Sequence, residues 1–272
     1  QVSILQLYPF CAYLLIAKPG ARSASRNYLN RVLEDHADWR HVLRHIHTFA
    51  SKILDRIYLL NNRTQLFDLH VQSDNPLRTS RPDGQGMLML GAHLGSFEAL
   101  RAVVHQSAQT PSLALLMYEA NAKKMSRLMA AINPSMTQEI IALGELGSML
   151  NVQTRISQGT VIGMLADRTF QSDEVRWLPF LSQLAPFPLG PFRLAALLRR
   201  PLMLMVGAYK GRNQYHAHFE LLFDFSKAGL NRRDAIDEAL ARYVARLEHF
   251  CRLYPYNWFN FYDFWKSADT PQ

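Results

Sequence analysis

The sequence predicts an α/β fold in which a mostly parallel central sheet is flanked by helices. From residue 87 onward, short apolar runs alternate with stretches of helical character. This alternation is typical of a parallel sheet covered by helices on both faces. Hydrophobic residues make up 49% of the 272 residues and charged residues only 19%. This composition supplies a sizeable core and excludes an intrinsically disordered chain.

Each expected strand is a short, continuous apolar run, as in strands buried on both faces. These runs cover residues 87–92, 113–118, 139–143, 161–166, 202–209 and 215–223. Helices are expected at residues 96–106, 121–131, 147–157 and 191–200, and an amphipathic helix at 234–252. We therefore expect residues 76–272 to form one α/β domain.

Residues 1–75 are expected to form a helical region that associates with a membrane. Residues 2–17 carry no charge, but the stretch is shorter than the roughly 20 residues of a spanning helix. Lys18, Arg22, Arg26 and Arg31 follow, as expected where a segment meets anionic headgroups. The alternative is a buried helix packed on the core.

A single helix is expected over residues 27–60, where apolar side chains recur at helical spacing. His41 and His45 lie four residues apart, a spacing that can ligate zinc. No acidic base or third ligand accompanies them, so a solvated helix face is the favoured interpretation and no metal site is expected.

The formal net charge is +8, and the two cysteines, Cys11 and Cys251, lie far apart. The cysteine count excludes a disulfide scaffold and favours a reducing compartment. A multi-span membrane protein is also excluded, because the chain has no second long apolar run. The positive charge suits an anionic membrane surface or nucleic acid.

The most informative segment is residues 90–98, in which His93 is followed five positions later by Glu98. An expected strand ends just before His93, Gly95 permits a tight turn, and Ser96 can cap a helix. Ligands of doubly wound folds bind at the carboxyl ends of strands. A carboxylate on one imidazole nitrogen would fix the tautomer and leave the other nitrogen as a base. The alternative is a capping box with His93 merely in a loop.

Several blocks resemble the lysophospholipid acyltransferase superfamily, and most closely its bacterial lipid A lauroyl/myristoyl acyltransferase branch. They are GAHLGSFE at 91–98, GMLADR at 163–168, LPFL at 178–181, FPLGPFRLA at 187–195 and YPYNW at 254–258. The segments MYEANA, GPFRLAALLRRP and YPYNWFNFYDFW resemble a subgroup encoded beside aryl-polyene or pigment-lipid genes in Gram-negative bacteria.

The resemblance implies an acyltransferase in which His93 is the general base and Glu98 orients it. The acceptor hydroxyl would attack the thioester of an acyl carrier protein or coenzyme A, with no metal, cofactor or covalent enzyme intermediate. The glycerol-phosphate branch carries a glutamate where this chain has Leu189. This departure disfavours a glycerol-phosphate acceptor.

Further candidate substrate-binding residues follow the expected strands or begin a helix. Glu119 and Asn121 follow one strand, Asp167 and Arg168 follow another, and Arg193 lies in a helix whose amide end at Gly190 can face an anion. A structural ion pair at Asp167 and Arg168, and a surface position for Arg193, are the alternatives. Gly95 and Ser96 complete the substrate-binding set, and Met117, Met164 and Met205 are either acyl-groove lining or ordinary core.

Residues 254–265 hold eight aromatic side chains, which suit core packing or contact with a membrane interface or acyl chain. The favoured function is a peripheral or monotopic acyltransferase at the cytoplasmic face of the bacterial inner membrane. It would transfer a fatty or aryl-polyene acyl group to a lipid or glycolipid. The alternatives are lysophospholipid or ornithine-lipid acylation and a non-catalytic lipid- or carrier-binding protein; nucleic-acid binding is not expected.

Overall fold

A computed structural model describes residues 8–72, 84–106, 112–134, 139–144, 147–169, 173–227, 229 and 231–266. In this part of the chain, a seven-stranded sheet has the order β1-β9-β8-β2-β5-β3-β4. Neighbouring strands pair in parallel except β8 and β9, which are antiparallel. The expected α/β fold with a mostly parallel sheet is therefore confirmed. The strands are β1 Asp68–Val71, β2 Leu88–Gly91, β3 Leu113–Tyr118, β4 Glu139–Leu143, β5 Val161–Leu165, β8 Pro201–Gly211 and β9 Gln214–Asp224.

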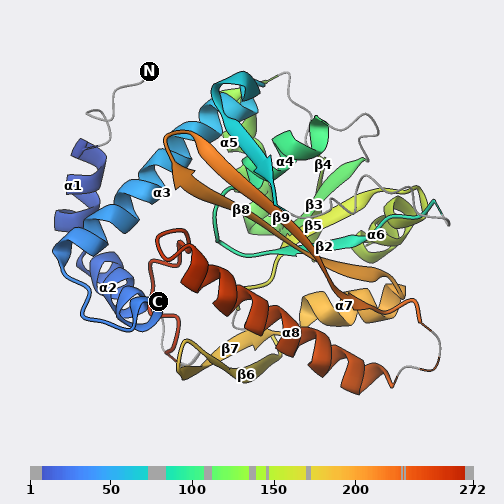
Figure 1. Cartoon of the computed structure of the whole chain (residues 1–272). Coiled ribbons are helices and arrows are strands. Elements are labelled where there is room, and N and C mark those ends of the chain that lie inside the picture. Colours follow the sequence, from blue (N-terminus) through green and yellow to red (C-terminus); the bar gives the residue numbers. More distant parts are fainter. Residues whose placement is uncertain are drawn as a thin grey trace.

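Helices cover both faces of this sheet (Figure 1). Alternate residues of the central strands pack toward α4 on one face, where Met89, Met203 and Met205 meet Leu100 and Val103. The intervening residues pack toward α6, α7 and α8 on the other face. The helices are α1 Tyr8–Ala17, α2 Pro19–Leu33, α3 Trp39–Leu60, α4 Phe97–His105, α5 Glu119–Ile132, α6 Ser148–Ser157, α7 Gly190–Leu198 and α8 Arg232–Leu253.

The helix expected over residues 27–60 is two helices, α2 and α3. Glu34 adopts a left-handed conformation with a φ of 54° and ends α2. Asp38 then caps α3 by accepting hydrogen bonds from the backbone N–H groups of Arg40 and His41. The His41 side chain completes the capping box. The apolar spacing continues across this break, so periodicity alone could not reveal it.

His45 is fully buried, so the expected solvated position is wrong for this residue. Its Nδ1 lies 2.8 Å from Ser25 Oγ, and its Nε2 lies 2.9 Å from the carbonyl oxygen of Trp258. His41 does lie at the surface, as expected. The described residues contain no cluster of side chains that could hold a metal ion.

The N-terminal helices pack together, and α1 contacts both α2 and α3 (Figure 1). Cys11 of α1 is buried, whereas Tyr13 is 55% exposed and Ile16 is 78% exposed. None of the described helices has the length and apolarity needed to cross a membrane. Strand β1, which precedes residue 76, pairs with β9, so the central sheet includes part of the expected helical region.

A separate antiparallel hairpin joins β6 Val175–Phe180 to β7 Gln183–Pro188. The aromatic segment 254–265 packs beside it. The centre of the Phe180 ring lies 5.4, 5.8 and 6.1 Å from the ring centres of Trp258, Phe264 and Trp265. Trp258 is fully buried. Most of the aromatic side chains of this segment are therefore packed in the core, which was one of the two roles expected for them.

Candidate active site

His93 lies just beyond the carboxyl end of β2, in a turn that the neighbouring strands hold in place. Gly95 donates its backbone N–H to the carbonyl of Asn257, and Ser96 donates its own to the carbonyl of Gly207. Gly95 has a φ of +72°, and a Cβ there would lie 2.0 Å from the Gly207 oxygen. Only glycine fits this position, so the turn that presents His93 depends on it.

Asp167, two residues after β5, is the hydrogen-bond partner of the His93 imidazole. Its Oδ1 lies 2.8 Å from His93 Nδ1, and its Oδ2 accepts from the His93 backbone N–H at 3.0 Å. Oδ2 also accepts from Trp258 Nε1 at 3.0 Å and from Asn260 Nδ2 at 2.9 Å. Asp167 is fully buried and held from several directions. With the Nδ1 proton directed at Asp167, the lone pair is on Nε2.

Glu98 has a different partner from the one expected. Its Oε1 accepts from Arg56 Nε at 2.5 Å, and its Oε2 accepts from Ser96 Oγ at 3.1 Å. Ser96 caps α4 by accepting from the Ala99 N–H, which fixes Glu98 in the first helical turn. The carboxylate that pairs with His93 is therefore that of Asp167, and the expected pairing with Glu98 is wrong. A buried carboxylate without a partner would be costly, so the ion pair with Arg56 stabilises the buried Glu98 side chain.

Both buried carboxyl groups have a lowered pKa. Burial alone would raise the pKa of Asp167, but the charge and hydrogen bonds of His93, together with Arg168, lower it to about 2. Burial likewise opposes ionisation of Glu98, whereas Arg56 and Lys52 hold its pKa below the ordinary value. Both groups are therefore ionised at neutral pH, as a carboxylate that orients an imidazolium must be.

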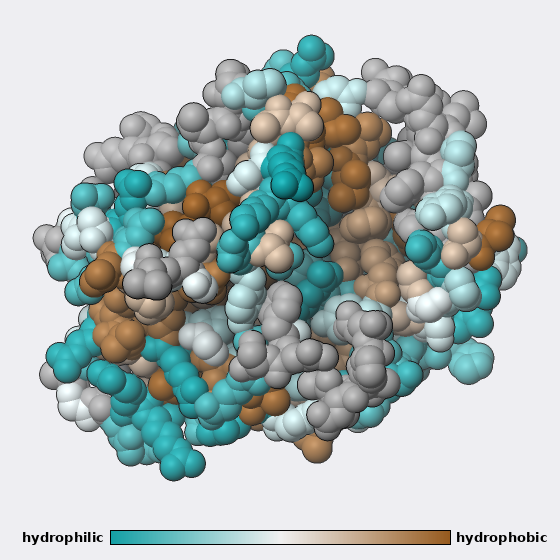
Figure 2. Space-filling model, turned by 180° about the vertical axis from the view of Figure 1, so that it is seen from behind, coloured by the Kyte–Doolittle hydropathy of each residue, from teal (hydrophilic) through white to brown (hydrophobic). Residues whose placement is uncertain are grey.

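A cavity of about 1310 Å³ opens in front of His93, at the carboxyl ends of β2, β3 and β5. Its walls are mainly apolar, and its charged side chains include Arg56, Lys124, Arg168 and Arg193. From behind, the molecule shows an apolar hollow bordered by hydrophilic side chains (Figure 2). Apolar lining comes from Phe97, Leu115, Met117, Met125, Leu128, Met129, Gly163, Met164, Leu165, Leu194, Leu197 and Met205.

The expected substrate-binding residues divide between the cavity and its surroundings. Asn121, Arg168, Gly190 and Arg193 line the cavity, as do the three candidate methionines Met117, Met164 and Met205. Gly95, Ser96 and Asp167 do not line the cavity. Gly95 and Ser96 form the turn that presents His93, and Asp167 is buried beneath the His93 imidazole as its hydrogen-bond partner. Arg193 forms an ion pair with Glu174 at 2.6 Å, with both side chains about half exposed.

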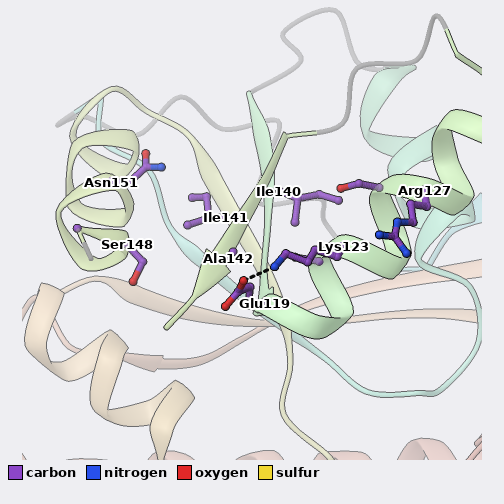
Figure 3. Close-up of a pocket in the computed structure, with 11 residues that line it drawn as sticks. Glu119, Lys123, Arg127, Ile140, Ile141, Ala142, Ser148 and Asn151 are labelled. Carbon is purple, nitrogen blue, oxygen red and sulfur yellow. Dashed lines mark hydrogen bonds and ion pairs between the residues drawn. The ribbon is translucent and has the colours of Figure 1, made fainter. Parts of the chain in front are cut away.

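Glu119 lies in a second pocket, of about 520 Å³, at the outer edge of β4. There it forms an ion pair with Lys123 of the same helix (Figure 3). Ser148 and Asn151 of α6 face this pocket from the other side of β4. Glu119 is therefore outside the cavity that contains His93, although Asn121, two residues later, is inside it.

Sequence reasoning missed three residues that organise the site. Trp258 and Asn260 hold Asp167, and Arg56 pairs with Glu98 across 42 positions of sequence. The aromatic segment was a visible signal, but its hydrogen bonds to Asp167 depend on the tertiary fold. Arg56 lies in a long amphipathic helix, where a single arginine carries no distinguishing pattern.

The arrangement has the parts of a general base directed at a lipid-sized cavity. His93 is 28% exposed, and its Nε2 is available to take a proton from a group bound in front of it. Cys11 and Cys251 are both buried, and Cys251 has a pKa raised well above the ordinary value by burial, so neither resembles an activated thiol nucleophile.

A known protein family and a solved structure resemble this chain. Residues 47–267 match the model of the family described as bacterial lipid A biosynthesis acyltransferase. No curated protein is significantly similar in sequence. Among solved structures, the 1-acyl-sn-glycerophosphate (LPA) acyltransferase PlsC from Thermotoga maritima aligns over 90% of this chain and 94% of its own, with 11% identity and a TM-score of 0.38. The family match spans most of the chain, including the His93 turn, Asp167 and the aromatic segment, and this chain thus belongs to the bacterial lipid A biosynthesis acyltransferase family.

Proposed function

We propose that this lipid acyltransferase moves an acyl chain from a carrier thioester to a hydroxyl of a membrane lipid or glycolipid, with His93 as general base. The observation that carries the proposal is the His93–Asp167 pair at the mouth of a large apolar cavity. Asp167 takes the orienting role that the sequence assigned to Glu98. The donor is an acyl carrier protein or coenzyme A thioester that carries a fatty or aryl-polyene acyl group.

In the proposed step, the acceptor oxygen attacks the thioester carbonyl carbon while its proton passes to His93 Nε2. The tetrahedral intermediate then collapses, the carbon–sulfur bond breaks, and the imidazolium returns the proton to the departing sulfur. The products are an ester and a free thiol. Asp167 stabilises the imidazolium through Nδ1 and stays ionised throughout.

The apolar walls support the assignment of an acyl-binding groove. Leu115, Met117 and Met125 on one side of the cavity, and Leu194 and Leu197 on another, offer side chains that pack against hydrocarbon. The absence of a nearby activated nucleophile among the described residues favours direct transfer over a covalent enzyme intermediate.

A peripheral position on the cytoplasmic face of the bacterial inner membrane suits these substrates. The family implies a lipid acceptor, and Tyr13 and Ile16 of α1 expose apolar surface near the cations Lys18 and Arg22. Apolar side chains with adjacent cations are typical of helices that lie at an anionic interface.

The direct test replaces His93 with alanine and measures transfer from an acyl carrier protein thioester to membrane lipid. Loss of the base is expected to reduce the rate by about 10²–10⁴-fold or more, in a protein that remains folded. His36→Ala, at an exposed position, is the matched control and should retain full activity. Full turnover by His93→Ala would refute the mechanism, and lipid binding without any turnover in the wild-type protein would favour a non-catalytic role.

A further inference from the structure

Asn260 lies between two opposite charges that are neighbours in sequence. Its Nδ2 donates to Asp167 Oδ2 at 2.9 Å, and its Oδ1 accepts from Arg168 Nε at 2.7 Å. The side chain is only 2% exposed, so bulk water does not compete for either hydrogen bond. An amide between an anion and a cation has one favourable orientation, with its NH2 toward the carboxylate and its oxygen toward the guanidinium. The Asn260 side chain is therefore fixed at both ends.

The C-terminal segment holds Arg168 away from Asp167. Arg168 Nη2 donates to the carbonyl of Phe259 at 3.2 Å, and the guanidinium carbon lies 5.6 Å from the centre of the Tyr262 ring. Within the described residues, Asp167 and Arg168 form no direct ion pair, although they are adjacent in sequence. Arg168 instead remains part of the cavity wall.

The two oxygens of the Asp167 carboxylate have different partners. Oδ2 accepts from the His93 backbone N–H at 3.0 Å, from Trp258 Nε1 at 3.0 Å and from Asn260 Nδ2 at 2.9 Å. Three donors on one oxygen oppose rotation of the carboxylate and direct Oδ1 at His93 Nδ1, 2.8 Å away. A guanidinium often binds both oxygens of a carboxylate at once. A direct pair with Arg168 would therefore compete with the imidazole for Asp167.

We propose that Asn260 is a positioning residue, an amide spacer that satisfies Asp167 and Arg168 separately and so reserves the carboxylate for His93. The inference rests on the proposed function, in which His93 is the base. Asn260 does not line the cavity, so it acts through Asp167 rather than on a substrate.

Two substitutions of Asn260 should change the pH dependence of acyl transfer in opposite directions. Asn260→Asp keeps the shape of the side chain and can still accept from Arg168, but it adds a negative charge beside Asp167. That charge favours the imidazolium form of His93, so the acidic limb of the pH–rate profile should move to higher pH by about one unit.

Asn260→Leu has a similar volume but removes the amide and leaves Asp167 open to the Arg168 guanidinium. The guanidinium then offsets the carboxylate charge, so the acidic limb should move to lower pH. The rate at the optimum pH should fall about tenfold in each variant, the effect of losing a hydrogen bond to a charged group.

The opposite directions separate this role from a merely structural one. Loosening of the C-terminal segment would lower the rate in both variants without moving the acidic limb in opposite directions. The other charged and titratable groups around His93 are the same in both variants and in the wild type. They come from α3, α4, α5 and the C-terminal segment, and include Lys52, Arg56, Glu98, Lys124, Tyr262 and Asp263.

A second measurement needs no acyl transfer. Diethyl pyrocarbonate modifies neutral imidazole, and His93 is 28% exposed. Mass spectrometry of the peptide that contains His93 then gives the pH at which its modification is half-maximal. This midpoint should rise in Asn260→Asp and fall in Asn260→Leu. Asn257→Ala is the control, because it removes a buried amide of the same segment that bonds to the Tyr209 backbone, and its midpoint should equal that of the wild type.

The result is separable from a failure of the proposed reaction. Opposite shifts of the modification midpoint, in a protein that transfers no acyl group, would support the spacer and count against the reaction only. Unchanged midpoints in both folded variants, or shifts in the same direction, would overturn the spacer. If Asn260→Leu does not fold, the midpoint of Asn260→Asp decides alone, and an unchanged or lower value overturns the spacer.

Discussion

The hydrogen bond between His93 and Asp167 joins the ends of two neighbouring strands, β2 and β5, which pair in parallel. A parallel sheet brings the residues after its strands to one edge, so groups 74 positions apart in sequence become adjacent. Sequence reasoning placed both residues at strand ends and predicted His93 as the base. It predicted Glu98 as the partner of His93 because the two residues are close in sequence, whereas the order of the strands in the sheet cannot be read from the sequence.

The fate of Glu98 illustrates the limit of a short motif. Its spacing from His93 suits a carboxylate partner, but in the folded chain the Glu98 carboxylate accepts a hydrogen bond from Arg56 of α3 instead. Which of two nearby carboxylates an imidazole takes depends on the cations and amides around each one. Those groups come from α3 and from the C-terminal segment, distant parts of the sequence that no local pattern connects to the motif.

Gly163 provides a residue-scale prediction about the acyl chain. It lines the cavity, and a Cβ at this position would lie 3.3 Å from Met205 Cε and 3.5 Å from both Leu115 Cδ2 and Phe97 Cε2. Gly163→Val should fill part of the groove and shift the preferred donor toward shorter acyl chains. The measurement is the transfer rate across a series of acyl lengths.

Gly163→Ala is the matched control, because flexible Met205 can move aside for a single methyl group. Its chain-length preference should remain close to that of the wild type. An unaltered preference in a folded Gly163→Val protein would show that the acyl chain does not pass this strand.

At the scale of elements, the apolar runs predicted the strands β3 and β4 well, and the observed bounds of both equal those expected. The β6–β7 hairpin was missed because prolines interrupt it and its turn uses Leu181 and Ser182 at positive φ. Proline is tolerated there because, among the described residues, the two strands pair only with each other. Tight hairpin turns usually contain glycine or asparagine, and this turn contains neither.

The buried side chain of His45 joins α3 to α2 and to the aromatic segment. Because the folded protein holds this imidazole in its neutral form, we expect the protein to lose stability in acid. Burial lowers its pKa to about 4, despite its hydrogen bond to Trp258. The unfolded chain therefore binds more protons than the folded one between pH 6.5 and 4. The free energy of unfolding should fall by about 3 kcal/mol as the pH falls through this range. Urea unfolding at pH 7 and pH 4.5 checks this.

His45→Gln removes the titrating group and serves as the comparison. Other histidines keep some pH dependence, including His218, whose pKa is lowered to about 4 by burial and by neighbouring charges. The fall in stability between the two pH values should therefore be smaller in His45→Gln but not absent. An equal fall in both proteins would exclude His45 as its source.

For the whole molecule, the net charge of +8 combines with an apolar α1 to predict binding to an anionic bilayer. Attraction to anionic lipid weakens as salt screens it, whereas apolar insertion does not. Sedimentation with phosphatidylglycerol vesicles should therefore exceed sedimentation with phosphatidylcholine vesicles and decline as salt is raised.

Ile16→Glu should reduce this vesicle binding, because the Ile16 side chain of α1 is 78% exposed. Leu221→Glu makes the same change on β9, where Leu221 is 59% exposed, and should have little effect. Equal losses in the two variants would assign the binding to overall charge rather than to α1.

The central claim is that Asp167, and not Glu98, orients the base of an acyl-transfer site. It is tested most directly by the single-turnover rate of acyl transfer in Asp167→Asn and Glu98→Gln, measured side by side with saturating substrates. We predict that Asp167→Asn, which favours the wrong imidazole tautomer, slows the chemical step by about 10²–10⁴-fold, whereas Glu98→Gln changes it far less. A collapse of the rate in Glu98→Gln with near-normal chemistry in Asp167→Asn would contradict this account.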